Sequence, residues 1–142
     1  MGALAADKII GVVGAGTMGA GIAQVAAAAG HPVKLFDNVP GAAAMGIANI
    51  RKGLERLVSR GKMSAVDAAT LVERIEPNDT IDALGDAALI VEAIVENLQI
   101  KQKVFSGLEE RCGEDVILAT NTSSISVTAI SAGLKRPQNL VG

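Results

Sequence analysis

The sequence contains very few of the side chains that build disulfides and zinc sites. It has one cysteine, Cys112, and one histidine, His31, in 142 residues. A single cysteine excludes an intrachain disulfide and a cysteine-based metal cluster, and a single histidine removes most zinc sites. Cys112 falls on the apolar stripe of an expected helix, which favours inert packing over a reactive thiol. We interpret His31, which follows Gly30 in an expected helix-to-strand turn, as structural. We expect neither a secreted disulfide scaffold nor a metalloenzyme.

Aromatic and basic residues are scarce as well. The chain has no tryptophan or tyrosine and only two phenylalanines, Phe36 and Phe105, so stacking on bases is not expected to contribute to recognition. It has 13 Lys and Arg residues against 15 Asp and Glu residues, a net charge of −2. Proteins that bind nucleic acid usually carry a basic excess on one face. Nucleic acid is therefore not an expected partner.

The longest segment without a charged residue is residues 9–33, which is long enough to span a membrane. Six glycines and a proline interrupt it, which argues against a membrane helix. The first residues, Met1 to Lys8, lack a positively charged leader, and Ala6 stands where a myristoylation signal needs Ser or Thr. We expect a cytoplasmic protein without a membrane segment.

Apolar runs that are typical of strands alternate with helix-like stretches along the chain. The runs predict buried strands at 8–13, 32–36, 87–93 and 116–120, with a weaker signal at 74–77. Apolar residues at helical spacing predict helices between them, and two helices, the second capped by Ser64, form a hairpin after the second strand. Parallel strands need such crossover connections. We expect one domain over residues 1–142, an α/β fold of the Rossmann type: a doubly wound, mostly parallel sheet with a helical hairpin inserted after strand 2.

A glycine-rich segment lies directly between the first strand and the first helix. It reads Gly14-Ala15-Gly16-Thr17-Met18-Gly19, the GxGxxG pattern. The first glycine permits a tight turn, the second lets the backbone approach a pyrophosphate, and the third lets helix and strand pack closely. Free N–H groups at the start of the helix bind phosphate. Packing alone is the alternative explanation of these glycines.

Asp37 strengthens the interpretation of this turn as a dinucleotide site. It stands 18 residues after Gly19, at the end of the second strand, where a carboxylate can accept hydrogen bonds from an adenosine ribose. The alternative is an acid that only caps a turn. Gly14, Asp37, Glu96 and Asn121 all fall at or just beyond the carboxyl ends of predicted strands, which form one edge of the sheet. We therefore predict one continuous site at that edge.

Four segments, taken together, resemble one family. They are residues 9–19 (IIGVVGAGTMG), 89–97 (LIVEAIVEN), 121–124 (NTSS) and Arg136-Pro137. Over essentially its whole length the chain resembles the N-terminal, NAD-binding domain of 3-hydroxyacyl-CoA dehydrogenases, most of all those of bacteria that act on 3-hydroxybutyryl-CoA and 3-hydroxyadipyl-CoA. The resemblance implies NAD as cofactor, an acyl-CoA substrate and reversible oxidation of a (3S)-3-hydroxyacyl-CoA to a 3-ketoacyl-CoA in fatty acid metabolism.

The resemblance also implies roles for residues at the strand ends. Glu96 and Lys101 would contact the cofactor, Ser123 would hydrogen-bond the substrate oxygen beside the nicotinamide, and Asn121 would lie in the same shell. Judged from the residues alone, the run from Asn121 to Ser124 could equally be a helix N-cap. Glu96 and Lys101 could likewise form an exposed salt bridge of little energetic value.

Other parts of the family's site are expected outside residues 1–142. They are the catalytic histidine, the glutamate that orients it, and a helical C-terminal domain that completes the acyl-CoA site and supplies most of the dimer contact. His31 is not a substitute, because it lies near the amino ends of the strands. We therefore expect a homodimeric parent enzyme and a 142-residue chain that binds NAD but is inactive alone.

Charge suggests two further features. An ionised Asp37 would repel a 2′-phosphate, so the chain should prefer NAD to NADP. Residues 51–62 hold five of the thirteen basic residues and one acid, and Arg56 and Arg60 would bind CoA phosphates. A solvated helix face is the alternative, and Gly53 stands where the family has a serine contact.

Three other functions share a glycine turn of this kind. They are a β-hydroxyacid dehydrogenase acting on free acids, a methyltransferase using S-adenosylmethionine, and a nucleotide-binding module without chemistry. The segment 121–124 argues against the first, and binding measurements with NADH and S-adenosylmethionine would separate the other two.

Overall fold

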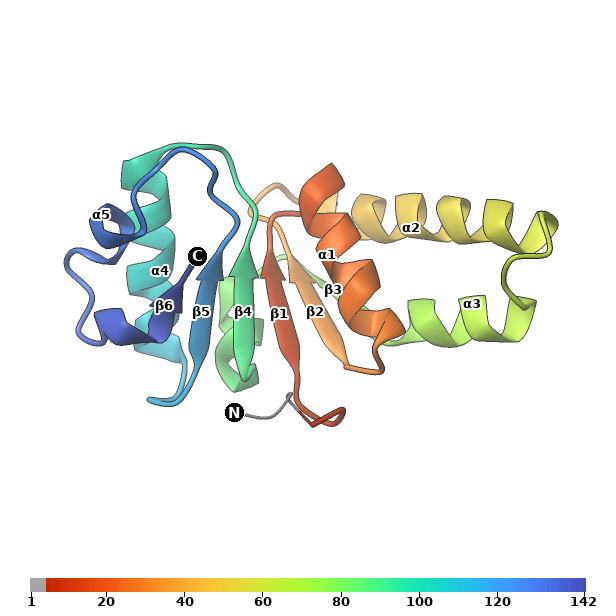
Figure 1. The fold of residues 1–142 in the computed structure, drawn as a ribbon, viewed down its shortest axis with the longest axis horizontal. Coiled ribbons are helices and arrows are strands. Elements are labelled where there is room, and N and C mark those ends of the chain that lie inside the picture. Colours follow the sequence, from red (N-terminus) through yellow and green to blue (C-terminus); the bar gives the residue numbers. More distant parts are fainter. Residues whose placement is uncertain (1–4) are drawn as a thin grey trace.

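The computed structural model describes residues 5–142, and at its centre lies one parallel sheet (Figure 1). The six strands are arranged in the order β3-β2-β1-β4-β5-β6, and every neighbouring pair is parallel. They are β1 (Ile10–Val13), β2 (Val33–Phe36), β3 (Ile75–Asn78), β4 (Leu89–Glu92), β5 (Ile117–Thr120) and β6 (Leu140–Val141). All five strands expected from the sequence form, and the Rossmann-type fold is confirmed.

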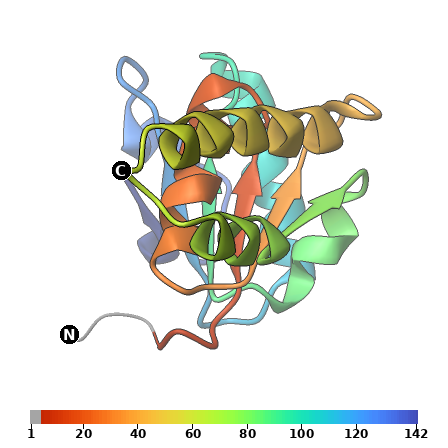
Figure 2. The ribbon, with the colours of Figure 1, turned by 90° about the vertical axis from the view of Figure 1, so that its right-hand side faces the viewer.

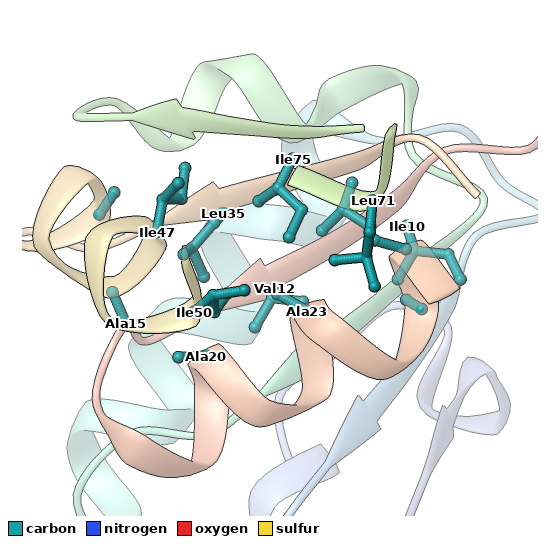
Figure 3. Packing of buried hydrophobic residues seen from close by; sticks show 14 of the residues in the cluster. Ile10, Val12, Ala15, Ala20, Ala23, Leu35, Ile47, Ile50, Leu71 and Ile75 are labelled. Carbon is teal, nitrogen blue, oxygen red and sulfur yellow. The ribbon is translucent and has the colours of Figure 1, made fainter. Parts of the chain in front are cut away.

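Helices cover both faces of this sheet. They are α1 (Thr17–Ala28), α2 (Ala42–Ser59), α3 (Ala65–Glu73), α4 (Leu98–Arg111) and α5 (Val127–Ser131), with two 3₁₀ turns, η1 (Ile81–Asp86) and η2 (Pro137–Asn139). Consecutive strand residues point to opposite faces. Val12 and Leu35 therefore pack under α1 and α2 (Figure 3), whereas Val13 and Phe36 belong to the core under α4 and α5. This two-sided burial explains why the central strand β1 (IGVV) is wholly apolar, whereas the edge strand β3 (IEPN), buried only at Ile75, is not.

The predicted helical hairpin is present as α2 and α3. The two helices lie side by side and extend away from the sheet (Figures 1 and 2). Gly61, at φ +70°, supports the turn between them, and the Ser64 hydroxyl caps α3 by accepting from the Asp67 N–H at 3.1 Å. Leu54 and Leu71 of the hairpin are buried, and they pack in the same core as Val12 and Leu35.

The uncharged segment 9–33 divides into β1, the glycine turn, α1 and the start of β2. Within residues 5–142, no helix is long and apolar enough to cross a membrane. Residues 1–4, which are part of the segment considered for a leader, lie outside the described residues.

Three features were not expected from the sequence. β6 pairs with β5 through only two residues, too few for a periodic pattern. η1 and η2 are short 3₁₀ turns with no strong signal of their own. The strand expected at 87–93 is restricted to 89–92, because Ala87 directly follows η1 and Ala93 begins the loop to α4.

Candidate functional site

The carboxyl ends of β1, β2, β4 and β5 meet at one edge of the sheet. In register, Val13 lies opposite Phe36 on one side and Glu92 on the other, and Glu92 lies opposite Thr120. Backbone hydrogen bonds continue one step beyond the strands: the Gly14 N–H donates to the Phe36 carbonyl at 2.8 Å, and the Asn121 N–H to the Glu92 carbonyl at 2.9 Å. The strand ends that carry the predicted residues therefore lie side by side, and the continuous site expected along them stays a prediction.

Two glycines of the turn are required by the protein itself. Gly14 has φ +107°, and a Cβ there would stand 2.6 Å from the Ala93 carbonyl oxygen. A Cβ at Gly19 would overlap the Gly14 carbonyl. These positions allow the tight turn and the close packing of α1 on β1.

Gly16 differs from both, because neither its backbone conformation nor any neighbouring atom of residues 5–142 requires a glycine there. Its backbone, at φ −70° and ψ −170°, is open to any residue, and no atom lies within 4 Å of a Cβ built on it. Gly16 is the N-cap of α1, which has no side-chain cap and no acidic residue in its first turn. Gly16, Thr17 and Met18 are all exposed. The open space and the uncapped helix start fit a bound phosphate group.

Asp37 connects the end of β2 to the glycine turn. One carboxylate oxygen accepts from the Ala15 N–H at 2.9 Å, and the other accepts from the Val39 N–H at 2.9 Å. The side chain therefore does more than cap its own turn, since one of its bonds holds the turn of the predicted cofactor site. Each carboxylate oxygen can accept more than one hydrogen bond, so ribose hydroxyls can still bind.

Glu96 accepts hydrogen bonds from the loop that follows β5. One of its oxygens accepts from the hydroxyls of Thr122 at 2.8 Å and Ser124 at 2.7 Å, and the other lies 2.9 Å from the Lys101 ammonium. Hydrogen bonds from Ser124, Lys101 and Thr122, in that order of effect, lower the pKa of Glu96 to about 2. Glu96 is therefore a stable anion at neutral pH.

Lys101 lies beneath Glu96 instead of in the open site. Its side chain is 1% exposed, and its ammonium also donates to Glu92 at 2.7 Å. Glu92 is fully buried and accepts from the Thr120 hydroxyl at 2.6 Å. The alternative of an exposed salt bridge is therefore wrong for Lys101. Its contact with the cofactor stays a prediction.

The sequence argument did not single out Glu92 or Thr120. An acid inside the apolar run 89–95 was the available signal for Glu92, because buried carboxylates are rare unless paired. Its partner Lys101 lies nine residues further on, on a helix, and no local pattern joins the two.

Ser123 and Asn121 lie exposed on the loop held by Glu96. The Ser123 N–H lies 3.4 Å from a Glu96 oxygen, and no described residue within 5–142 is hydrogen-bonded to its hydroxyl. The alternative that this run caps a helix is wrong, because the N-cap of α5 is Ser126, whose hydroxyl accepts from the Ala129 N–H. Ser123 is therefore available to a ligand.

A groove of about 650 Å³ lies between α1 and α2, and it includes Gly16 and Thr17 of the glycine turn. From α2 it is lined by Asn49, Lys52 and Arg56. The sequence had pointed to Arg56, which lies in the groove, and to Arg60, which follows α2 as its C-cap and is not among the lining residues. Lys52 was missed, although its spacing of one helical turn from Arg56 placed both on one face.

His31 lies at the opposite edge of the sheet, in the turn before β2, where its Nδ1 is 3.1 Å from the Lys8 carbonyl oxygen. It is therefore far from the strand ends that form the site, which agrees with the structural interpretation.

Comparisons with known proteins agree with this geometry. The profile described as 3-hydroxyacyl-CoA dehydrogenase, NAD binding domain, matches residues 9–142. The chain is 44% identical over 135 residues to a 3-hydroxyadipyl-CoA dehydrogenase of Escherichia coli K12, covering 95% of this chain and 28% of that protein. It is 42% identical over 133 residues to a 3-hydroxybutyryl-CoA dehydrogenase of Clostridioides difficile, covering 94% of this chain and 47% of that one.

A solved structure of a protein with a related name is similar to this chain as well. The crystal structure of (S)-3-hydroxybutyryl-CoA dehydrogenase from Ralstonia eutropha superposes with a TM-score of 0.91 at 37% identity, covering 96% of this chain and 48% of that one. The chain thus spans less than half the length of these relatives.

Proposed function

Because the chain belongs to the 3-hydroxyacyl-CoA dehydrogenase family, as its NAD-binding domain, we propose that the protein oxidises a (3S)-3-hydroxyacyl-CoA reversibly to a 3-ketoacyl-CoA. Bound NAD would accept the hydride that leaves C3 of the substrate, and a base would accept the hydroxyl proton. The single observation that supports a dinucleotide site most directly is Gly16, a glycine that neither its backbone conformation nor packing against residues 5–142 explains.

Different residues at the strand ends would bind different parts of the cofactor. The turn Gly14–Gly19 and the uncapped start of α1 would bind the pyrophosphate, and Asp37 would bind the adenosine ribose. Glu96, anionic and fixed by Lys101, would lie at the nicotinamide half. This assignment places all three contacts on one edge of one domain.

Ser123 and Asn121 would orient the substrate. The free Ser123 hydroxyl can donate a hydrogen bond to the oxygen on C3, and the Asn121 side chain is exposed beside it. Such positioning contributes up to roughly 7–11 kcal/mol of the barrier in well-oriented systems. It requires that Glu96 keep the loop 121–124 in place.

The proton acceptor would come from outside residues 1–142. A general base works best with a pKa near the working pH, and the pKa of Glu96, about 2, is far below it. His31 lies at the wrong edge of the sheet. We propose a histidine, oriented by a glutamate, in a helical domain that completes the acyl-CoA site and forms a homodimer contact.

The groove between α1 and α2 is the proposed site of the CoA phosphates. Lys52 and Arg56 line it, and Arg60 would contact a phosphate beyond its end. Acyl-CoA and NAD both carry ionised phosphates and do not cross a bilayer unaided. The protein therefore acts in a compartment that holds both, and we propose the cytoplasm.

Two measurements test the proposed function. Calorimetric titration should show binding of NADH and none of S-adenosylmethionine; the reverse would indicate a methyltransferase. Oxidation of NADH with acetoacetyl-CoA should be catalysed by the full-length protein and stay at background for residues 1–142 alone, because a general base contributes roughly 10²–10⁴-fold by itself. Turnover of free 3-hydroxy acids but not of their CoA esters would favour a β-hydroxyacid dehydrogenase. NADH binding without turnover of either substrate would favour a module without chemistry.

A further inference from the structure

A buried ion pair lies directly under the site. Glu92 is fully buried, and the Lys101 side chain is 1% exposed. Taking two charges out of water is costly, and replacing such a pair with apolar residues of similar volume is often neutral or stabilising. Packing of the core under α4 and α5 therefore does not explain why this position holds two charges.

Every remaining bond of the pair leads to a loop of the site. Besides Lys101, Glu92 accepts from the Ile94 N–H at 2.7 Å, which fixes the start of the loop between β4 and α4. Its other oxygen accepts from the hydroxyl of Thr120, the last residue of β5. Lys101, in the first turn of α4, uses a second N–H to hold Glu96. Glu92 thus connects the ends of β4 and β5 to the first turn of α4, at the edge where the loops of the site lie.

The contacts continue from Glu96 to the exposed edge. Its outer oxygen accepts from Thr122 and Ser124 and so determines where the loop 121–124 lies. An unbroken series of hydrogen bonds and ion pairs therefore runs from a fully buried carboxylate, through Lys101 and Glu96, to the loop that carries Ser123.

From this arrangement we propose that Glu92 is a positioning residue of the cofactor and substrate site. It touches neither ligand. It balances the buried ammonium of Lys101 and thereby sets the position of Glu96 and of the loop 121–124. This role rests on the proposed function, because it assigns Glu96 and Ser123 to the nicotinamide half of the site.

The decisive variant replaces the whole pair, as Glu92→Leu with Lys101→Met, so that no buried charge is left unpaired. A matched control is Glu109→Gln at the other end of α4. Glu109 is also a buried carboxylate and accepts from the N–H groups of Lys135 and Arg136, but its partners lie away from the site. The variants are compared by melting temperature, NADH affinity from fluorescence, and amide hydrogen exchange without cofactor.

The double variant should fold but raise the Kd for NADH at least tenfold. In the absence of cofactor, the amides of Ser124 in the loop and of Ile125 directly after it should exchange at least tenfold faster. In the full-length protein kcat should fall more than KM for acetoacetyl-CoA changes. Glu109→Gln should lower the melting temperature and change the Kd for NADH less than twofold.

A double variant with unchanged loop exchange and an unchanged Kd would overturn the proposal and make the pair merely structural. If the double variant does not fold, Glu92→Gln decides, since it keeps the shape and removes the charge. A Kd raised at least threefold supports the role, and any smaller change overturns it. Failure of the parent protein itself to bind NADH would instead refute the proposed function. The two failures can be told apart, because loop exchange is measured without cofactor.

Discussion

Replacing Gly16 with alanine separates the needs of the ligand from the needs of the fold. The position has an ordinary backbone conformation and no atom within 4 Å of the new Cβ. Alanine is a poorer N-cap than glycine by about 1 kcal/mol, and the loss of unfolded-state entropy returns about 0.4–1 kcal/mol. The free energy of unfolding should therefore change by less than about 1 kcal/mol, which is roughly 4 °C in melting temperature.

Binding should respond far more than stability. The added methyl group occupies the space through which a pyrophosphate reaches the backbone N–H groups of α1. We expect Gly16→Ala to raise the Kd for NADH at least tenfold, a loss of about 1.4 kcal/mol. Calorimetric titration and thermal denaturation of the same sample measure both quantities.

Two neighbouring glycines serve as controls. Gly21→Ala, on the same helix and also open to solvent, should gain about 1 kcal/mol of helix stability and leave NADH affinity unchanged. Gly19→Ala should destabilise the protein, because its Cβ overlaps the Gly14 carbonyl. If Gly16→Ala bound NADH as tightly as the parent, the turn would not contact the pyrophosphate, and the reasoning from the empty space would be refuted.

Three further outcomes are expected. The protein should bind NADPH at least tenfold more weakly than NADH, because the Asp37 carboxylate would face the 2′-phosphate, a like-charge contact worth on the order of several kcal/mol; equal affinities would contradict this role. In the full-length protein, replacing Lys52 and Arg56 with Gln should raise KM for acyl-CoA and leave NADH affinity unchanged, with Arg60→Gln having a smaller effect; an unchanged KM would identify a solvated helix face. Burial raises the pKa of the Cys112 thiol, so alkylation by iodoacetamide should be slow at neutral pH and accelerate only as pH rises towards that pKa, and rapid reaction at pH 7 would show a thiol less buried than the structure indicates.

Local signals were sufficient for most of the fold. The apolar runs of β1 and β2 are largely buried on both faces, and that of β4 is buried on one face and half-buried on the other, so their hydrophobicity alone marked them as parallel strands. The turn after β1 was equally visible, since three glycines at fixed spacing lead into a helix and the third lies in its first turn. β6 could not be found in this way, because its two residues pair with β5 only once the chain has folded back.

The candidate site could be predicted only for residues whose place follows from the local sequence, and not for contacts between residues far apart in the chain. Asp37 follows its strand directly, so its position was clear, whereas its bond to the Ala15 N–H joins residues 22 positions apart. Glu92 and Lys101 meet because a strand and a helix bring them together. Similarly, the groove holding Lys52 needs α1 as its second wall, which the charge pattern of α2 alone does not reveal.

In its proposed role at the adenosine ribose, Asp37 would couple cofactor choice to cofactor affinity, because the same carboxylate also holds the glycine turn. An engineer who replaces Asp37 with a small neutral residue to admit a 2′-phosphate also removes the acceptor of the Ala15 N–H, next to Gly16. The first step towards NADP should therefore weaken the binding of every dinucleotide, the desired one included. A successful redesign has to supply a new acceptor for that N–H as well as a cation for the phosphate, and selection acting on single substitutions meets the same obstacle.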